Sequence, residues 1–569
     1  MEPPIPEPID PQILPCGAHE TPDLPRSMSS RSDLPRKPEK DTLQTDDATY
    51  ATKHEEEYVT GIKLYMILAA LVLAQFVVML DISIMATAIP RITNTFNSLL
   101  DVGWYGSAYQ LASASLQPLT GKIYTFFRTK WTFFAYFLLF ELGSLLCAVA
   151  TSSTMLIVGR AVTGMGASGV LTGGLTIVAA CLPEDRRPTI LGVMIAIGQL
   201  GQACGPLIGG AFTEYVSWRW CFYINLPIGG IIAALLTRIH VPERIAKPQL
   251  RKVLGTAVES LDLLGFAIFA PASIQFFLAL QYGGNQYPWN SPTVIGLFCG
   301  AGVTLILFLG WEYRRGDAAM VPSSILRQRI VWSSCAVLFF QMGVLVCAAY
   351  YLPIYFQAVK NASPLMSGVY MLPNICFQIL MALVSGGLVQ KVGYCLPWVV
   401  AGTTFCAVGF GLLSLLTPTY STGARIGYQI LFGIGGGCVL SMPYISIQNL
   451  AAPAQTPITM ALLLFCQNFG GSIFLTVAQT VFSNSLRDAI STNVPGANVE
   501  AIVAAGATAF RTVVSSAQLK GVLDAYCTSI THVFYLVCGV AVCAFCSGWG
   551  LGWRDLRVKK SRSPSQPAP

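Results

Sequence analysis

Long apolar runs recur along most of this 569-residue chain, and charged residues rarely interrupt them. Each run holds about 20 residues or more, enough for an α-helix to cross a ~30 Å hydrocarbon core at ~1.5 Å per residue. Backbone groups in lipid must bond within the protein, and the alternating pattern of a β-barrel is absent, so we predict helices. We predict fourteen spans, at residues 62–88, 102–121, 131–150, 155–181, 188–212, 219–239, 261–281, 291–311, 331–356, 365–389, 394–416, 424–447, 458–482 and 531–551.

The composition points to the same class of protein. Hydrophobic residues make up 53% of the chain and charged residues 11%, whereas about a quarter of a soluble domain is charged. A water-soluble protein of this composition could not cover its surface, so we predict an all-α membrane protein. The net charge of +7 comes from basic residues between the spans, a pattern typical of cytoplasmic loops and not of nucleic-acid binding.

The 17 cysteines follow no metal-site or disulfide spacing, and most lie inside apolar runs, where cysteine behaves as a small hydrophobic residue. The chain also lacks a phosphate-binding Gly-x-x-x-x-Gly-Lys-Ser/Thr motif and a Ser-His-Asp arrangement. We therefore expect no metal, no cofactor and no enzymatic activity, and we exclude ATP hydrolysis within this chain.

Polar tails flank the apolar region. Residues 1–58 contain ten prolines and 13 of the 28 acidic residues, and we predict a disordered tail without a signal peptide. Residues 554–569 are basic and polar. With the amino terminus inside, the cytoplasmic side holds twenty lysines and arginines and the outer side seven, three of them in the outer loop 483–530. This asymmetry predicts that both tails are cytoplasmic.

An internal duplication organises the spans. Gly-Met-Gly at 164–166 recurs as Gly-Ile-Gly at 433–435, and the same 269-residue offset relates Gly201 to Gly470. Parallel six-helix repeats are typical of facilitator-type transporters, whose substrate site lies between the halves. We predict an N-terminal six-helix bundle at 59–240, two inserted helices with linkers at 241–330, and a C-terminal six-helix bundle at 331–553.

Few ionisable residues lie inside the predicted spans, and those away from the span ends are Asp81, Glu141 and Arg160. Asp81 and Arg160 both fall roughly 8–10 Å below the outer surface at ~1.5 Å per residue. We hypothesise that they face one cavity and interact, so that alternating solvent access drives proton uptake and release. The alternative is a static ion pair between two helices. For Glu141 we favour a protonated carboxyl bonded to a neighbouring helix, with proton coupling as the alternative.

The fifth span contains Gly201, Gly205 and Gly209 at every fourth position, which makes one flat face for close helix packing. Pro206 removes a backbone donor and bends the helix, and Gly210 completes a terminal Gly-Gly pair. A flat face beside a bend suits a helix that rocks against its partner, although small residues at this spacing also serve ordinary packing.

The string from Gly201 to Gly210 resembles the antiporter motif of the major facilitator superfamily. The first span from Leu80 to Pro90 resembles the signature of its fourteen-span drug:proton antiporter family, and 159–166 resembles the fourth-span motif, whose arginine is implicated in proton coupling. The segments 218–229 and 351–357 are similar to this family's fungal toxin and multidrug exporters. The resemblance covers residues 62–551 and implies two six-helix bundles plus two inserted helices.

The loop after the second span departs from the family pattern. Gly121 and Lys122 are followed by Thr125 where the family commonly has aspartate, and Arg128 replaces a second glycine. A latch built on an Asp–Arg pair is therefore not expected here. We predict that Lys122, Arg128 and Lys130 hold this cytoplasmic gate loop to phosphates of the anionic leaflet.

The amide and phenol side chains within the spans indicate the chemical class of the substrate. Wide apolar cavities with a few such groups suit amphipathic organic molecules, whereas an anion would require more than one buried arginine. Each amide could equally bond a neighbouring helix. The candidate cavity residues are Tyr109, Gln110, Gln199, Gln202, Asn225, Tyr351, Gln448 and Gln467.

These features, with the resemblance, imply proton-coupled efflux of a small fungal metabolite or drug by a monomer whose partners are its substrate, protons and the lipid bilayer. We expect the plasma membrane, with the vacuolar membrane as the alternative. The other functions considered are a vacuolar basic amino-acid or siderophore carrier and a nutrient receptor on a transporter fold. Asn361 fits a glycosylation acceptor in an outer loop, but Pro364 follows closely and we expect it to be unoccupied.

Overall fold

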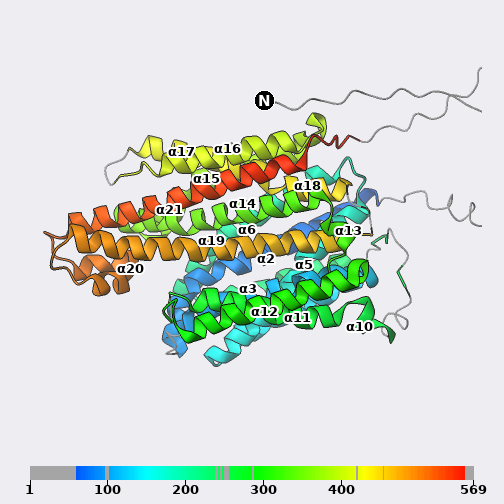
Figure 1. Cartoon of the computed structure of the whole chain (residues 1–569), viewed down its shortest axis with the longest axis horizontal. Coiled ribbons are helices and arrows are strands. Elements are labelled where there is room, and N and C mark those ends of the chain that lie inside the picture. The colour runs from blue at the N-terminus through cyan, green and yellow to red at the C-terminus, as the bar shows by residue number, and fades with distance from the viewer. Residues whose placement is uncertain are drawn as a thin grey trace, which may run out of the picture. The chain divides into compact units, whose positions relative to one another are not determined.

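The computed structural model describes residues 59–96, 101–237, 241–243, 247–248, 255–284, 287–417, 421–450, 452 and 454–557. The tail predicted at 1–58 and most of the one predicted at 554–569 lie outside the described residues. The described chain is mostly helical (Figure 1).

The first helices correspond to the six predicted N-terminal spans, the sixth being broken into two pieces. They are α2 (Gly61–Phe96), α3 (Val102–Phe126), α4 (Thr129–Ala148), α5 (Ser153–Cys181), α6 (Arg187–Tyr215), α7 (Trp220–Tyr223) and α8 (Asn225–Thr237). The predicted insertion follows as α10 (Ala257–Ser260), α11 (Leu263–Tyr282), α12 (Pro292–Arg315), the 3₁₀ turn η2 (Gly316–Ala318) and α13 (Ser323–Leu326).

The remaining helices correspond to the six predicted C-terminal spans. They are α14 (Arg329–Ile354) with the π-helical turn η3 (Tyr355–Val359), α15 (Pro364–Val392), α16 (Leu396–Leu413), α17 (Thr422–Leu440), α18 (Met442–Leu450), α19 (Thr456–Asn493), α20 (Val499–Val513) and α21 (Leu519–Gly548) with the 3₁₀ turn η4 (Trp549–Leu551). In Figure 1 the long helices run alongside one another.

Thirteen helices in the described residues are long and apolar enough to cross a membrane. The other predicted span is α3, whose 25 residues reach about 37 Å but whose polar side chains lower its hydropathy. Some of those side chains form hydrogen bonds inside the protein. Gln117 donates to Thr172 Oγ1 on α5 at 2.7 Å, and Thr120 lies 3.1 Å from the same hydroxyl. The predicted count of fourteen is therefore reached as thirteen apolar helices plus α3.

The predicted repeat is visible in how equivalent helices pack. A Cβ atom added at Gly201 of α6 would lie 2.6 Å from the carbonyl oxygen of Phe76 on α2. A Cβ atom added at Gly470 of α19 would lie 2.7 Å from Phe339 Cα on α14. The pairs α3–α5 and α4–α5 likewise have counterparts in α15–α17 and α16–α17. The two six-helix halves thus use glycines at matching positions to bring matching helices together.

The inserted helices α11 and α12 pack on each other and, through α11, on one helix from each half. Trp104 of α3 meets Tyr282 edge-to-face with ring centroids 6.1 Å apart, and Phe276 lies 5.0 Å from Phe469 of α19. In Figure 1 α11 lies beside α3. The insertion therefore borders both halves without joining either bundle.

The segment 483–530, predicted as an outer loop, is largely helical. Helix α19 continues to Asn493, α20 covers Val499–Val513, and α21 begins at Leu519. Polar residues end the apolar run here without ending the helix. The Asn498 side chain caps α20 by accepting from Ala501 N at 3.1 Å, and Phe510 stacks on Tyr526 at 4.8 Å.

Candidate functional site

A buried ion pair joins α2 and α5 in the N-terminal half. Arg160 Nη1 lies 2.6 Å from Asp81 Oδ2, and the two side chains are 2% and 0% exposed. Arg160 Nε also donates to the carbonyl oxygen of Tyr105 at 3.1 Å. The structure thus brings together Asp81 and Arg160, which residue counting had placed at the same depth below the outer surface. Tyr105 was not anticipated, because its contribution is a main-chain carbonyl.

Aromatic rings and a close helix approach position the guanidinium group. The Arg160 guanidinium carbon lies 4.7 Å from the Tyr109 ring centroid and 6.0 Å from that of Phe222. A Cβ atom at Gly164, one turn further along α5, would lie 2.9 Å from Tyr109 Cα. The glycine therefore lets α5 approach α3 until Tyr109 lies against the cation. Tyr109, predicted in the substrate cavity, is 2% exposed at the ion pair.

Asn225 lies at the same ion pair. The Asn225 side chain is fully buried, and its Nδ2 donates to Asp81 Oδ1 and to Ser144 Oγ, each at 3.1 Å. Both hydrogens of the Asn225 amide are therefore used inside the N-terminal half, and its role in lining the substrate cavity stays a prediction. Both Asp81 oxygens thus accept a hydrogen bond, from Arg160 and from Asn225.

Glu141 lies three residues before Ser144 on α4. Both of its carboxyl oxygens are buried, and neither has a hydrogen-bond partner among the residues that the structure describes. The carboxyl group packs against Gly229 of α8. The predicted hydrogen bond to a neighbouring helix is therefore absent from the described residues.

The glycine face predicted on the fifth span packs on α2 beside Asp81. A Cβ atom at Gly205 would lie 2.9 Å from Ile84 N, and one at Gly209 would lie 2.8 Å from Ile84 O. Pro206, on the same helix, is exposed, and nothing lies within 4 Å of a Cβ at Gly210. The three spaced glycines therefore set the position of the helix that carries Asp81, whereas Gly210 does not.

The remaining predicted cavity residues lie at several places. Gln110, Gln199 and Gln202 are half-buried. In the C-terminal half, Tyr351 is buried and donates to Gln479 Oε1 at 3.2 Å, and Gln467 Oε1 accepts from Tyr444 at 2.5 Å. Asn361, the glycosylation candidate, is exposed in the turn before α15.

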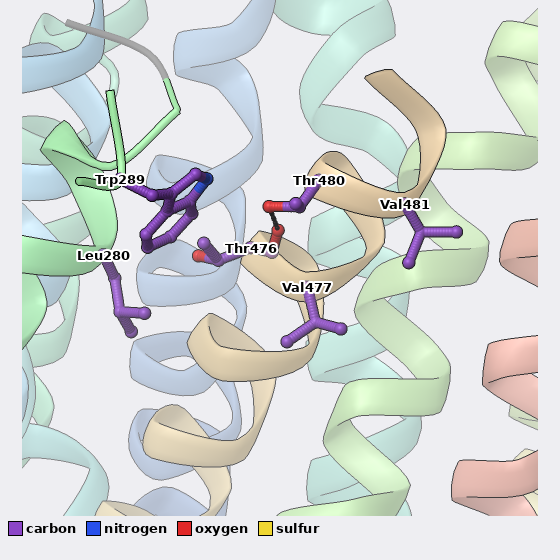
Figure 2. A pocket seen from close by; sticks show the side chains of 6 residues that line it. All are labelled: Leu280, Trp289, Thr476, Val477, Thr480 and Val481. Carbon is purple, nitrogen blue, oxygen red and sulfur yellow. Dashed lines mark hydrogen bonds between the residues drawn. The ribbon is translucent and has the colours of Figure 1, made fainter. Parts of the chain in front are cut away.

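An apolar cavity of about 270 Å³ lies between the insertion and α19. Figure 2 shows Leu280 and Trp289 facing four residues of α19. Two of these are threonines, but their hydroxyl groups donate to carbonyl oxygens four residues earlier and leave the lining apolar. None of the predicted cavity residues lines it. The lining residues are Leu280, Trp289, Thr476, Val477, Thr480 and Val481.

The two halves meet at the ends of the helices predicted to be cytoplasmic. Arg187 Nη1 donates to the carbonyl oxygen of Gln448 at 2.8 Å, and the Gln448 side chain donates to Leu175 O at 2.9 Å. A Cβ at Gly192 of α6 would lie 2.7 Å from Ala382 O on α15. Gln448, predicted in the cavity, is instead part of this contact, so the halves are closed together at this end.

The gate loop is held by protein and not by an exposed row of cations. Lys122 is 4% exposed and donates to the carbonyl oxygen of Ala318 at 3.2 Å, so it cannot reach lipid phosphates as predicted. Lys130 donates to Thr237 O at 3.0 Å, and Arg128 is exposed. A Cβ at Gly121 would lie 2.7 Å from Ile458 Cα, which places this glycine at the contact between the halves.

Two residues of the linker after α8, which sequence reasoning missed, hold the same loop. Glu243 Oε1 accepts from Thr129 N at 2.5 Å and Oε2 accepts from Thr129 Oγ1 at 2.7 Å. Lys247 Nζ donates to the carbonyl oxygens of Tyr124 at 2.8 Å and Thr125 at 3.1 Å. An anion at a helix start and a cation at a helix end both suit the helix dipoles. Glu243 thus places a carboxylate at the start of α4.

Burial lowers the pKa of the Lys247 ammonium group, and the Glu243 carboxylate, 3.8 Å away, partly offsets this shift.

No group of three or more His, Cys, Asp or Glu side chains in the described part of the chain could hold a metal ion.

The chain is similar in sequence to known membrane transporters. The family model described as the Major Facilitator Superfamily matches residues 71–475. The chain is 55% identical to the "MFS-type transporter pigP" of Monascus ruber over 508 residues, 89% of each chain. It is 47% identical to the "Efflux pump mlcE" of Penicillium citrinum over 533 residues, 92% of this chain and 96% of that one.

Two solved structures share the fold at low sequence identity. The human organic anion transporter MFSD10 (TETRAN) is 13% identical with a TM-score of 0.55, and the match covers 85% of this chain and all of that one. A bacterial homologue of the human lysosomal transporter Spinster, in an inward-facing conformation, is 14% identical with a TM-score of 0.54, covering 87% and 98%.

Proposed function

The chain belongs to the major facilitator superfamily, and from this premise we propose that it exports small amphipathic organic molecules in exchange for protons. It is an integral multi-pass membrane protein. Export is supported by relatives named as efflux pumps, one of which is 47% identical over 92% of this chain. The exported compound is proposed to be a fungal secondary metabolite or a drug.

The observation that carries the proton coupling is the buried Asp81–Arg160 ion pair. A charged carboxylate out of water is stable only while donors hold it, and here the guanidinium group and the Asn225 amide do so. Protonation of Asp81 removes its negative charge and weakens both hydrogen bonds. The helices α2 and α5 are then less firmly joined, which gives the proton a direct effect on the packing of the N-terminal half.

The contact between the halves supplies the second part of the cycle. In this structure the end predicted to be cytoplasmic is closed by Arg187, Gln448 and the Gly192 approach. We propose that this closed state binds protons from the outer side. Opening of the same contact then exposes the N-terminal bundle to the cytoplasm, where protons leave and the compound binds. Both termini are proposed to be cytoplasmic, and the protein is proposed to act as a monomer in the plasma membrane.

The experiment is an accumulation assay in a host that lacks its own efflux pumps. Cells that express the full chain are loaded with each member of a panel of fungal toxins and lipophilic drugs, and retention is measured with and without a protonophore. We expect lower retention of at least one compound, and the protonophore should abolish this difference. Asp81→Asn should retain the compound like empty cells, whereas Asp488→Asn, at an exposed acid, should behave like the wild type.

The outcomes separate the alternatives. Uptake of a basic amino acid or an iron chelate in place of export would favour a carrier of that class and contradict the proposal. Export that persists unchanged with protonophore or in Asp81→Asn would contradict the coupling. No effect on any compound, with the protein present at the membrane, would contradict transport of this class altogether.

A further inference from the structure

Glu141 is a buried carboxyl group to which the Asp81–Arg160 pair assigns no role. It lies in the middle of α4, and both of its oxygens are shielded from solvent without a hydrogen-bond donor among the described residues. Asp81, by contrast, has a donor on each oxygen. The two carboxyl groups therefore share one region of the N-terminal half but have opposite surroundings.

The space for Glu141 depends on a glycine of the neighbouring helix. A Cβ atom at Gly229 of α8 would lie 2.5 Å from the carboxyl carbon of Glu141 and 3.0 Å from its Oε2. Any larger residue at this position would have to displace the carboxyl group. The packing thus holds the Glu141 carboxyl group against the glycine backbone of α8. This helix has no ionisable side chain along Asn225–Thr237 that could pair with it.

The charged and titratable groups around Glu141 come from several helices. Asp81 on α2 and Arg160 on α5 form an ion pair with each other. Tyr109 on α3 lies against Arg160, and the other titratable side chains of α4 are Lys130, Tyr136 and Cys147. No described cation forms an ion pair with Glu141, and the nearby carboxylate opposes a second negative charge.

An ionised carboxylate in such a place would lack the hydrogen bonds that buried charges require. We propose that Glu141 is a second proton-binding residue, which carries a proton in this closed state while Asp81 is held in its ion pair with Arg160. The ionised form takes one proton from water on the side to which the bundle opens, an O–H bond forms on the carboxyl group, and no other bond changes. Its place in the transport cycle rests on the proposed function, but its protonation does not.

Ser144 offers a connection between the two carboxyl groups. It lies one turn after Glu141 on the same helix face, and its Oγ accepts from the Asn225 amide that also holds Asp81. Movement of Asn225 would therefore release Asp81 and also Ser144, which lies one turn from Glu141. This arrangement makes Asn225 and Ser144 positioning residues for the proton sites and not substrate contacts.

The test is infrared spectroscopy of the full chain in vesicles of phosphatidylcholine and phosphatidylserine, which needs no transported compound. A protonated carboxylic acid has a C=O stretching band that a carboxylate lacks, and this band shifts in heavy water. In spectra taken as the difference between ordinary and heavy water, where the lipid ester bands cancel, we expect the band in the wild type at neutral pH and a weaker band in Glu141→Gln. It should persist in Asp81→Asn and in Glu259→Gln, a control at an exposed residue.

Two further variants guard against misfolding of Glu141→Gln. Glu141→Asp keeps a carboxyl group but withdraws it from Gly229, so the band should shift in frequency and not vanish. Gly229→Ala should also shift the band, because the added methyl group displaces the carboxyl. The proposal is overturned if the wild type has no such band, if Glu141→Gln has the band at wild-type intensity, or if only Asp81→Asn weakens it. Failure of export with the band intact would instead count against the proposed function alone.

Discussion

Substitution of one glycine on α6 tests whether close packing on α2 positions Asp81, the proposed proton site. A Cβ atom at Gly205 would lie 2.8 Å from Ser83 Cβ and 2.9 Å from Ile84 N, whereas carbon contacts are favourable at about 3.5–4.0 Å. Helices α2 and α6 must then separate by roughly 0.5–1 Å, which sacrifices a quarter to a half of the attraction of each affected atom pair. We expect Gly205→Ala to destabilise the protein by about 1–3 kcal/mol.

The matched control lies on the same helix. Nothing lies within 4 Å of a Cβ atom at Gly210, so Gly210→Ala should be neutral or stabilise α6 by up to about 1 kcal/mol through helix propensity. Unfolding of both variants in detergent, followed by tryptophan fluorescence, gives the free energies. Proton-driven export should also fall in Gly205→Ala, since α2 carries Asp81. Equal stability and equal export in the two variants would refute the packing argument.

The linker after α8 gives two more predictions. Glu243→Gln should destabilise the protein by about 1.5–3 kcal/mol, because the charge-assisted bonds to the start of α4 are lost; Glu259→Gln, at an exposed residue, should not, and equal unfolding would contradict the capping role. Burial lowers the pKa of Lys247, so the unfolded chain binds more protons in the range between the lowered and the ordinary lysine pKa. Stability should therefore rise with pH across that range, and Lys247→Gln should remove this rise in unfolding measurements.

Hydropathy and the glycine offset were sufficient to predict the architecture. Spans buried in lipid or protein have few charged residues, and the recurrence of Gly201 as Gly470 corresponds to equivalent helix contacts. Where a span carries polar side chains that face neighbouring helices, as Gln117 of α3 faces α5, hydropathy underestimates the span. Where a helix continues past the apolar run, as α19 does to Asn493, hydropathy places its end too early.

The site was only partly predictable. Asp81 and Arg160 could be matched because depth along two antiparallel helices follows from residue counting. Asn225 could not be assigned, since a buried amide suits a cavity and a hydrogen bond equally well until its neighbours are known. Lys122 and Glu243 depend on where a distant linker and the inserted helices lie, which local sequence does not specify.

The measurement closest to the central claim is proton movement in vesicles that contain the purified full chain and a trapped pH-sensitive dye. Addition of a compound identified in the cell assay should move protons against the compound in the wild type. Asp81→Asn should exchange labelled for unlabelled compound across the membrane without any pH change. Proton movement of wild-type size in Asp81→Asn would contradict the account.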